Sequence, residues 1–170
     1  MRTCGTPLLE TIILIEALLT MSKTSIKIEI LTIEKAGIHL MIHAYINRKK
    51  AMMILDTGAS QTVFDKSRIK RFTGNEKIKE NEKRSIGVGG DDIISHETEI
   101  KSFRLGKLTI KNYMTVLLDL SHVNKSYKTL GLPAIDGVLG SDILFSHKAL
   151  IDYNKCRLHL KWKSAGKKKR

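Results

Sequence analysis

The most constraining feature of this sequence is an acidic turn that directly follows a short apolar run. Residues 51–55 (Ala-Met-Met-Ile-Leu) would be apolar on both faces of an extended chain, which predicts a buried, central β-strand. The next five residues are Asp56, Thr57, Gly58, Ala59 and Ser60. A buried strand therefore delivers a carboxylate, a small hydroxyl and a glycine into a tight turn. The triplet Asp-Thr-Gly occurs once in the chain.

Alternation of apolar and polar residues predicts further short strands on both sides of this run. It covers residues 26–30 and 38–46 before the run, and residues 93–104 and 107–118 after it. In the segment 107–118, the inward-facing residues are expected to be Leu108, Ile110, Met114 and Val116. The alternation indicates a fold in which sheets supply most of the core.

The C-terminal half adds a hairpin and little helix. Residues 149–152 and 156–160 flank a polar turn and are predicted to pair. Residues 121–130 are weakly helical, and a short helix is expected to begin near Ser141 or Asp142, either of which suits the N-cap position. The prediction is an all-β, single-domain, closed β-barrel-like fold with one or two short helices.

A charged stretch and a glycine-rich stretch lie between the central strand and the strand expected at 93–104. Residues 65–84 are rich in Lys, Arg, Glu and Asn and are expected to be a solvated surface stretch. The glycine-rich stretch consists of Ile86, Gly87, Val88, Gly89 and Gly90. Strand-like residues surround it, so it is predicted to be the tip of a hairpin.

The composition fits one globular domain, and its Cys and His residues favour neither a disulfide framework nor a metal site. The chain has 170 residues, of which 42% are hydrophobic and 28% are charged, enough for one domain with a core. Cys4 and Cys156 do not make a disulfide framework and are expected to be free thiols. His39 and His43 fall on a predicted strand without the acid of a His-Glu-x-x-His motif, so we expect no metal site.

The chain is basic, and part of the excess charge lies at its C-terminus. Lys and Arg outnumber Asp and Glu by 30 to 17, a net charge of +13. Nucleic acid is a conceivable partner of such a chain. The favoured interpretation of the basic tail, residues 163–170, is nevertheless a solvated end. Aromatic residues are only 5% of the chain, so stacking platforms for single strands are not evident.

Residues 1–24 are interpreted as an N-terminal extension. Their apolar stretch, residues 8–19, is too short and too acidic to span a membrane. The segment is either a short amphipathic helix that packs on the domain or an artefact of the assigned start, with translation beginning at Met21. Both interpretations predict a cytoplasmic protein.

Taken together, the motifs resemble those of the retropepsin-like aspartic proteases, single-domain relatives of pepsin found in retroviruses and bacteria. The resemblance rests on the turn at 56–60, on the flap-like stretch 86–90, and on an apolar pair followed by glycine about 80 residues after the turn. This second motif is Val138, Leu139 and Gly140. The resemblance spans residues 25–162, the expected protease domain. Where retroviral members carry Arg and then Asp or Asn after the glycine, this chain has Ser141-Asp142, a form typical of bacterial relatives.

The resemblance implies an aspartic endopeptidase that cleaves polypeptides as a homodimer, with no metal or organic cofactor. Such chemistry needs two facing carboxylates, one as a general base on water and one as a proton donor. Because the triplet occurs once, each chain would supply one Asp56 at a two-fold axis. Thr57 and Gly58 would shape the turn, and Ser60 would orient the carboxylate. The supporting residues would be Ala59, Val138, Leu139 and Gly140, and residues 86–90 would form the flap.

Less specific interpretations stay open beside this one. Asp56 could cap backbone amides in an Asx-turn, and Val138-Leu139-Gly140 could be ordinary core. A noncatalytic protein of the same fold would use its groove to bind extended peptides, or would pair through its sheet edges as an assembly module. Cleavage that depends on Asp56 distinguishes the enzyme from these alternatives.

Overall fold

The computed structural model describes residues 21–33, 37–74, 81–86 and 92–163. The strands are β1 (Met21–Ile33), β2 (Gly37–Ile46), β3 (Lys49–Leu55), β4 (Val63–Asp65), β5 (Asn81–Ile86), β6 (Asp92–Leu105), β7 (Leu108–Leu118), β8 (Gly137–Leu139), β9 (Leu150–Asp152) and β10 (Arg157–Lys163). The helices are α2 (Lys70–Thr73), α3 (Ser121–Thr129) and α4 (Ser141–Ser146). The predicted all-β fold with short helices is confirmed.

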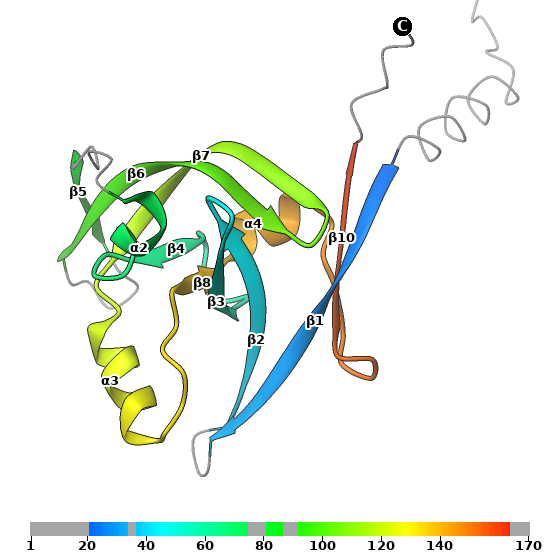
Figure 1. Cartoon of the computed structure of the whole chain (residues 1–170), viewed down its shortest axis with the longest axis horizontal. Coiled ribbons are helices and arrows are strands. Elements are labelled where there is room, and N and C mark those ends of the chain that lie inside the picture. Colours follow the sequence, from blue (N-terminus) through cyan, green and yellow to red (C-terminus); the bar gives the residue numbers. More distant parts are fainter. Residues whose placement is uncertain (1–20, 34–36, 75–80, 87–91, 164–170) are drawn as a thin grey trace, which may run out of the picture.

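The strands form one sheet that closes on itself. Its order is β5-β6-β7-β4-β8-β3-β2-β1-β10-β9, and β6 also pairs with β2. This extra pairing joins Tyr45 to Arg104 and Ile46 to Phe103, and closes a barrel of six strands. The hairpin of β5 and β6 and the terminal strands project from opposite sides of the barrel (Figure 1).

The first strand is long because it belongs to two ladders. Its first part, Met21 to Lys27, pairs antiparallel with β10, and its second part, Ile28 to Ile33, pairs with β2. In Figure 1, β1 and β10 run side by side away from the barrel. β9 pairs with the other edge of β10, so the N- and C-terminal parts of the described chain form a three-stranded extension of the sheet.

Two apolar clusters stabilise the barrel from inside and outside. The inner cluster includes side chains that are fully buried, among them Ile42, Met53, Phe64, Phe103 and Leu139. The outer cluster is formed where α3 packs on the barrel wall, and its buried members are Ile33, Met41, Leu120, Tyr127 and Ile135. Both faces of β3 are therefore covered, which explains why its sequence is apolar throughout.

Details of the secondary structure depart from the sequence-based expectations. The predicted surface stretch 65–84 begins with the last residue of β4, and it also contains α2 and the first residues of β5. β4 itself was not predicted. Met114 was expected to face inward but is 57% exposed. The inward phase of β7 changes at Asn112, whose φ of 50° lies in the left-handed region, so Tyr113, Thr115 and Leu117 point inward instead.

None of the helices in the described residues is long and apolar enough to cross a membrane. Within the same residues, no three His, Cys, Asp or Glu side chains lie together in a way that could hold a metal ion.

Candidate active site

The acidic turn lies where two strands far apart in sequence are brought side by side. β8 is inserted between β3 and β4, parallel to β3 and antiparallel to β4. Leu55, the last residue of β3, is paired with Leu139, the last residue of β8. The Asp56 amide continues this ladder by donating to the Leu139 carbonyl at 3.1 Å. The two motifs found in the sequence are therefore adjacent in the fold.

The turn exposes its carboxylate. Asp56, Thr57 and Gly58 are all exposed, directly after the buried Leu55. The amide of Gly58 donates to Asp56 Oδ1 at 2.8 Å. A Cβ on residue 58 would lie 3.2 Å from that same oxygen, so glycine leaves space for the carboxylate in this orientation. The Gly58 amide thus holds the Asp56 carboxylate in this orientation. Ser60 lies exposed in the same loop, and its expected role in orienting Asp56 stays a prediction.

The start of α4 is hydrogen-bonded to the acidic turn. Ser141 donates its hydroxyl to the Thr57 carbonyl at 2.7 Å and its amide to the Ala59 carbonyl at 2.7 Å. The N-cap position of α4 is Gly140, which has no side chain to cap the helix. The prediction of Ser141 or Asp142 as N-cap was therefore wrong, because both side chains are engaged by residues 57–62 and β7 instead.

A polar network behind the turn is centred on Asp142. Its Oδ1 accepts hydrogen bonds from the amide and the hydroxyl of Thr62, at 2.9 and 2.7 Å. Its Oδ2 accepts one from the hydroxyl of Tyr113 at 2.9 Å. The Thr62 hydroxyl also accepts the Gly140 amide at 3.0 Å, and Thr115 donates to the Thr62 carbonyl at 3.1 Å. The network joins α4, β7, the residue directly after β8 and the segment that follows the turn.

The network perturbs the titration of Tyr113. Burial, followed by the hydrogen bond to the Asp142 carboxylate, raises the pKa of the Tyr113 hydroxyl well above its ordinary value. The phenol therefore stays protonated and remains a donor to Asp142 throughout the neutral range. Its ring stacks on Phe103 with centroids 5.5 Å apart, which anchors the network to the barrel core.

The exposed turn opens into a cleft of about 380 Å³. Asp56 and Thr57 form part of its wall, and the rest comes from the start of β2, the end of β3 and the hairpin of β9 and β10. The lining residues outside the turn are Ile38, His39, Leu40, Ile54, Leu55, Ile151 and Tyr153. The cleft combines one carboxylate with a lining of both polar and apolar groups.

A second hollow, of about 500 Å³, lies on the α4 side of Thr57. Its lining is mainly apolar and includes Leu144, Phe145, Leu150 and Ile151. Phe145 is 88% exposed and Leu150 is 62% exposed. Large apolar side chains gathered at the surface commonly mark a protein interface.

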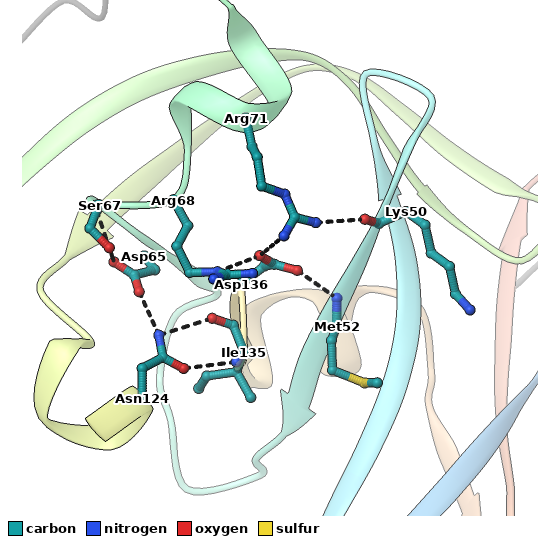
Figure 2. Close-up of polar contacts among 9 residues, drawn as sticks. All are labelled: Lys50, Met52, Asp65, Ser67, Arg68, Arg71, Asn124, Ile135 and Asp136. Atoms are coloured by element: carbon teal, nitrogen blue, oxygen red, sulfur yellow. Dashed lines mark hydrogen bonds and ion pairs between the residues drawn. The ribbon is translucent and has the colours of Figure 1, made fainter. Parts of the chain in front are cut away.

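Two buried carboxylates connect β3, β4, α2, α3 and the residues directly before β8 (Figure 2). Asp136 is 3% exposed and accepts from Arg68 Nε at 2.7 Å and from the Met52 amide at 2.9 Å, while Arg71 lies 3.4 Å away. Asp65 is fully buried and accepts from Ser67 and from Asn124 Nδ2. Asp136 directly precedes β8, so this network fixes the start of the strand whose end supports Asp56.

The predicted flap is only partly described. Ile86 is the last residue of β5 and pairs with Asp92 at the start of β6, so the two strands form a hairpin. Gly87, Val88, Gly89 and Gly90 lie outside the described residues.

Sequence reasoning missed the buried polar residues that support the site. Thr62, Asp65 and Asp136 are each less than 4% exposed, yet no local pattern separates them from surface polar residues. The available signal was position: Thr62 follows the acidic turn, and Asp136 immediately precedes the apolar Gly137-Val138-Leu139 strand.

A closed barrel whose central strand ends in an exposed Asp-Thr-Gly turn, with a second apolar strand inserted beside it, defines the retropepsin-like class of aspartic proteases. The aspartyl protease family model matches residues 42–143. Because this match covers more than half of the chain, the chain belongs to the aspartyl protease family. No curated protein matches the sequence significantly.

Solved structures share the fold at low sequence identity. A retropepsin-like aspartic protease from Rickettsia conorii is similar with a TM-score of 0.53 and 21% identity, over 84% of this chain and 92% of that one. The retroviral protease-like domain of Ddi1 from Leishmania major is similar with a TM-score of 0.50 and 18% identity, over 72% of this chain and 87% of that one. Both comparisons agree with the retropepsin-like fold.

Proposed function

We propose that this protein is an aspartic endopeptidase whose catalytic dyad consists of two Asp56 residues, one from each chain of a homodimer. The observation that carries the proposal is the exposed Asp56 carboxylate at the end of a buried strand, held by the Gly58 amide and opening into a cleft. Membership of the aspartyl protease family supports it. Residues 25–162 would form the protease domain.

The chemistry follows from two carboxylates brought close together. Carboxylates about 3 Å apart cannot both ionise, so the pair shares one proton. The ionised Asp56 removes a proton from a water molecule, which attacks the carbonyl carbon of the peptide bond. The protonated Asp56 of the other chain donates its proton to the carbonyl oxygen. Gly58 and Ser141 hold the turn so that neither carboxylate has to reorganise.

Two observations favour a homodimer. The chain has a single Asp-Thr-Gly triplet, and a symmetric dimer is the simplest way to provide the second acid. The apolar hollow formed by Leu144, Phe145 and Leu150 lies beside Thr57, where a second chain would have to approach. Burying the exposed side chains of Phe145 and Leu150 would contribute to association. Thr57 would then contact its counterpart across the two-fold axis.

The substrate would be an extended polypeptide. The hairpin of β5 and β6, with its tip at residues 86–90, would close over the cleft as a flap. A peptide in that position pairs with the enzyme through backbone hydrogen bonds, as an added strand does. The apolar walls supplied by Ile38, Leu40 and Ile54 would favour apolar side chains near the cleaved bond.

The test is cleavage of a mixed peptide library between about pH 3 and 8, the range in which carboxylate pairs titrate. Wild-type protein should cleave, Asp56→Asn should not, and activity per chain should rise with protein concentration. Turnover by a pure Asp56→Asn preparation would contradict the proposal. Absence of cleavage by both proteins in a dimeric preparation would favour a noncatalytic peptide-binding or assembly module of the same fold.

A further inference from the structure

The outward face of the β1–β10 ladder carries cations placed opposite one another. Lys23 pairs with Lys161, and Lys27 pairs with Arg157. All four side chains are exposed, and we call them the basic face. Like charges directly opposite each other on neighbouring strands destabilise a sheet. The ladder therefore carries an arrangement that its own stability does not explain.

The two-residue period of the strands keeps these charges on one side. The intervening residues Thr24, Ile26, Leu158 and Leu160 are buried against the barrel. The cationic side chains consequently cannot turn inward to find partners. Lys163, opposite Met21, extends the basic face by one more position. After Lys163 the sequence continues with Lys167, Lys168, Lys169 and Arg170.

The neighbouring carboxylates border the Lys27–Arg157 end of this surface and leave the Lys23–Lys161 end without a counter-charge. Asp152 of β9 pairs with Arg157 and lies 3.9 Å from Lys155. Glu29 lies two residues beyond Lys27, and its carboxylate is 3.5 Å from His43. Across the described parts of the chain, neither Lys23 nor Lys161 has a carboxylate within ion-pair distance.

We infer that the basic face binds the phosphate backbone of a nucleic acid. The remaining outward positions between these cations are Ser25 and His159. Apart from Met21 opposite Lys163, the described outward positions of this ladder offer no apolar side chain to enter a bilayer, and no Phe, Tyr or Trp to stack on bases. The contact would therefore be electrostatic and independent of base sequence. A second copy of the same face is excluded by its own charge.

The dimensions of the ladder suit a short run of phosphates. Lys23 and Lys27 are four residues apart on a strand, about 14 Å at the usual rise. One strand of a DNA duplex presents about four phosphates over that length. The two rows, about 5 Å apart, thus place four cations over a length that carries about four phosphates of one strand.

The experiment measures binding of the full chain to a labelled random-sequence DNA duplex by fluorescence anisotropy as a function of salt. Neutralising about four phosphates predicts an affinity loss of roughly 100-fold between 50 and 200 mM salt. The double variant Lys23→Gln/Lys161→Gln should weaken binding and lower the slope of log affinity against log salt by about 2. The control Lys70→Gln/Lys111→Gln has the same charge change on exposed residues of α2 and β7 and should keep the wild-type slope.

The outcomes separate the basic face from other causes. An equal loss in both double variants would show that only net charge matters and would overturn the inference. Binding that disappears on deletion of residues 164–170, yet is unchanged in Lys23→Gln/Lys161→Gln, would assign it to the tail and overturn it too. So would binding to phosphatidylserine vesicles or to polyglutamate without binding to DNA.

A folding control keeps the test valid. Because substitution of Lys23 and Lys161 relieves like-charge repulsion, the thermal midpoint of the variant should equal or exceed that of wild type. If the midpoint drops, the second pair serves as an independent variant, Lys27→Gln/Arg157→Gln. This variant should show the same loss of salt dependence, and a wild-type slope there would overturn the inference. None of these measurements depends on protease activity.

Discussion

The carboxylate of Asp142 accepts hydrogen bonds from both the amide and the hydroxyl of Thr62, at 2.9 and 2.7 Å. Since the same hydroxyl accepts the Gly140 amide, the helix that follows β8 and the segment that follows Asp56 are joined through one buried threonine. Asp142 directly follows Ser141, the position at which this sequence departs from the retroviral pattern. The acidic turn is thus supported by this chain's own polar network.

Replacing Asp142 by alanine should lower the free energy of unfolding by about 2–4 kcal/mol. The substitution leaves the Thr62 amide and the Tyr113 hydroxyl without their acceptor in a buried site. Asp142→Asn keeps one carbonyl oxygen for Thr62 and should cost less than half as much. Urea unfolding measures both values, and equal values for the two variants would contradict the assigned hydrogen bonds.

Gly140→Ala should destabilise the protein by about 1–3 kcal/mol or more, because a Cβ there would overpack the backbone. The added carbon would lie 2.5 Å from the carbonyl of Gln61 and 2.9 Å from the Thr62 amide nitrogen. Ser141→Ala, at the next residue, removes one hydrogen bond without a clash and should be milder. Thermal unfolding compares the two, and a stable Gly140→Ala protein would mean that β8 is not packed against residues 61 and 62 as described.

Removal of the buried Asp136 carboxylate should lower the free energy of unfolding far more than removal of Arg71, one of its two arginine partners. Asp136→Ala leaves the partly buried Arg68 guanidinium without its counter-ion and should cost about 3–5 kcal/mol. Arg71→Ala removes a half-exposed partner at 3.4 Å and should cost less than about 1 kcal/mol. Urea unfolding of both variants tests this ranking, and comparable losses would contradict it.

The Tyr113 hydroxyl should make stability fall in alkaline solution. Burial and the hydrogen bond to Asp142 raise the pKa of Tyr113, whereas the same group ionises near pH 10 in the unfolded chain. The contribution is therefore complete below about pH 10 and is lost as the pH rises towards the folded-state pKa. In urea unfolding between about pH 9 and 11, Tyr113→Phe should lose stability less steeply than wild type. If the free energies of unfolding of the two proteins fall in parallel with pH, ionisation of Tyr113 does not contribute to the loss.

The fold was predictable from the sequence because local patterns coincide with burial. The apolar run at residues 51–55 lies covered on both faces, and the alternating segments became the strands expected of them. The adjacency of the acidic turn and Val138-Leu139-Gly140 could be inferred only from the family resemblance. Nothing local in either motif specifies the parallel pairing that joins Leu55 to Leu139.

The polar support of the site could not be predicted, because its partners are distant in sequence. β4 has three residues and ends in the fully buried Asp65, so it lacks the length and the alternation of a strand. The side chains of Ser141 and Asp142 suit an N-cap. In the fold they form hydrogen bonds with residues 57–62 and β7 instead. Met114 faces outward because Asn112 changes the phase of β7.

A catalytic dyad shared between two chains is tested by a mixing experiment at constant total protein. Wild-type protein is equilibrated with increasing fractions of Asp56→Asn, and peptide cleavage is measured per wild-type chain. A shared dyad predicts that this activity falls in proportion to the wild-type fraction, because mixed dimers contain only one Asp56 carboxyl. Activity per wild-type chain that stays constant at every ratio would show that each chain works alone and would contradict a shared dyad.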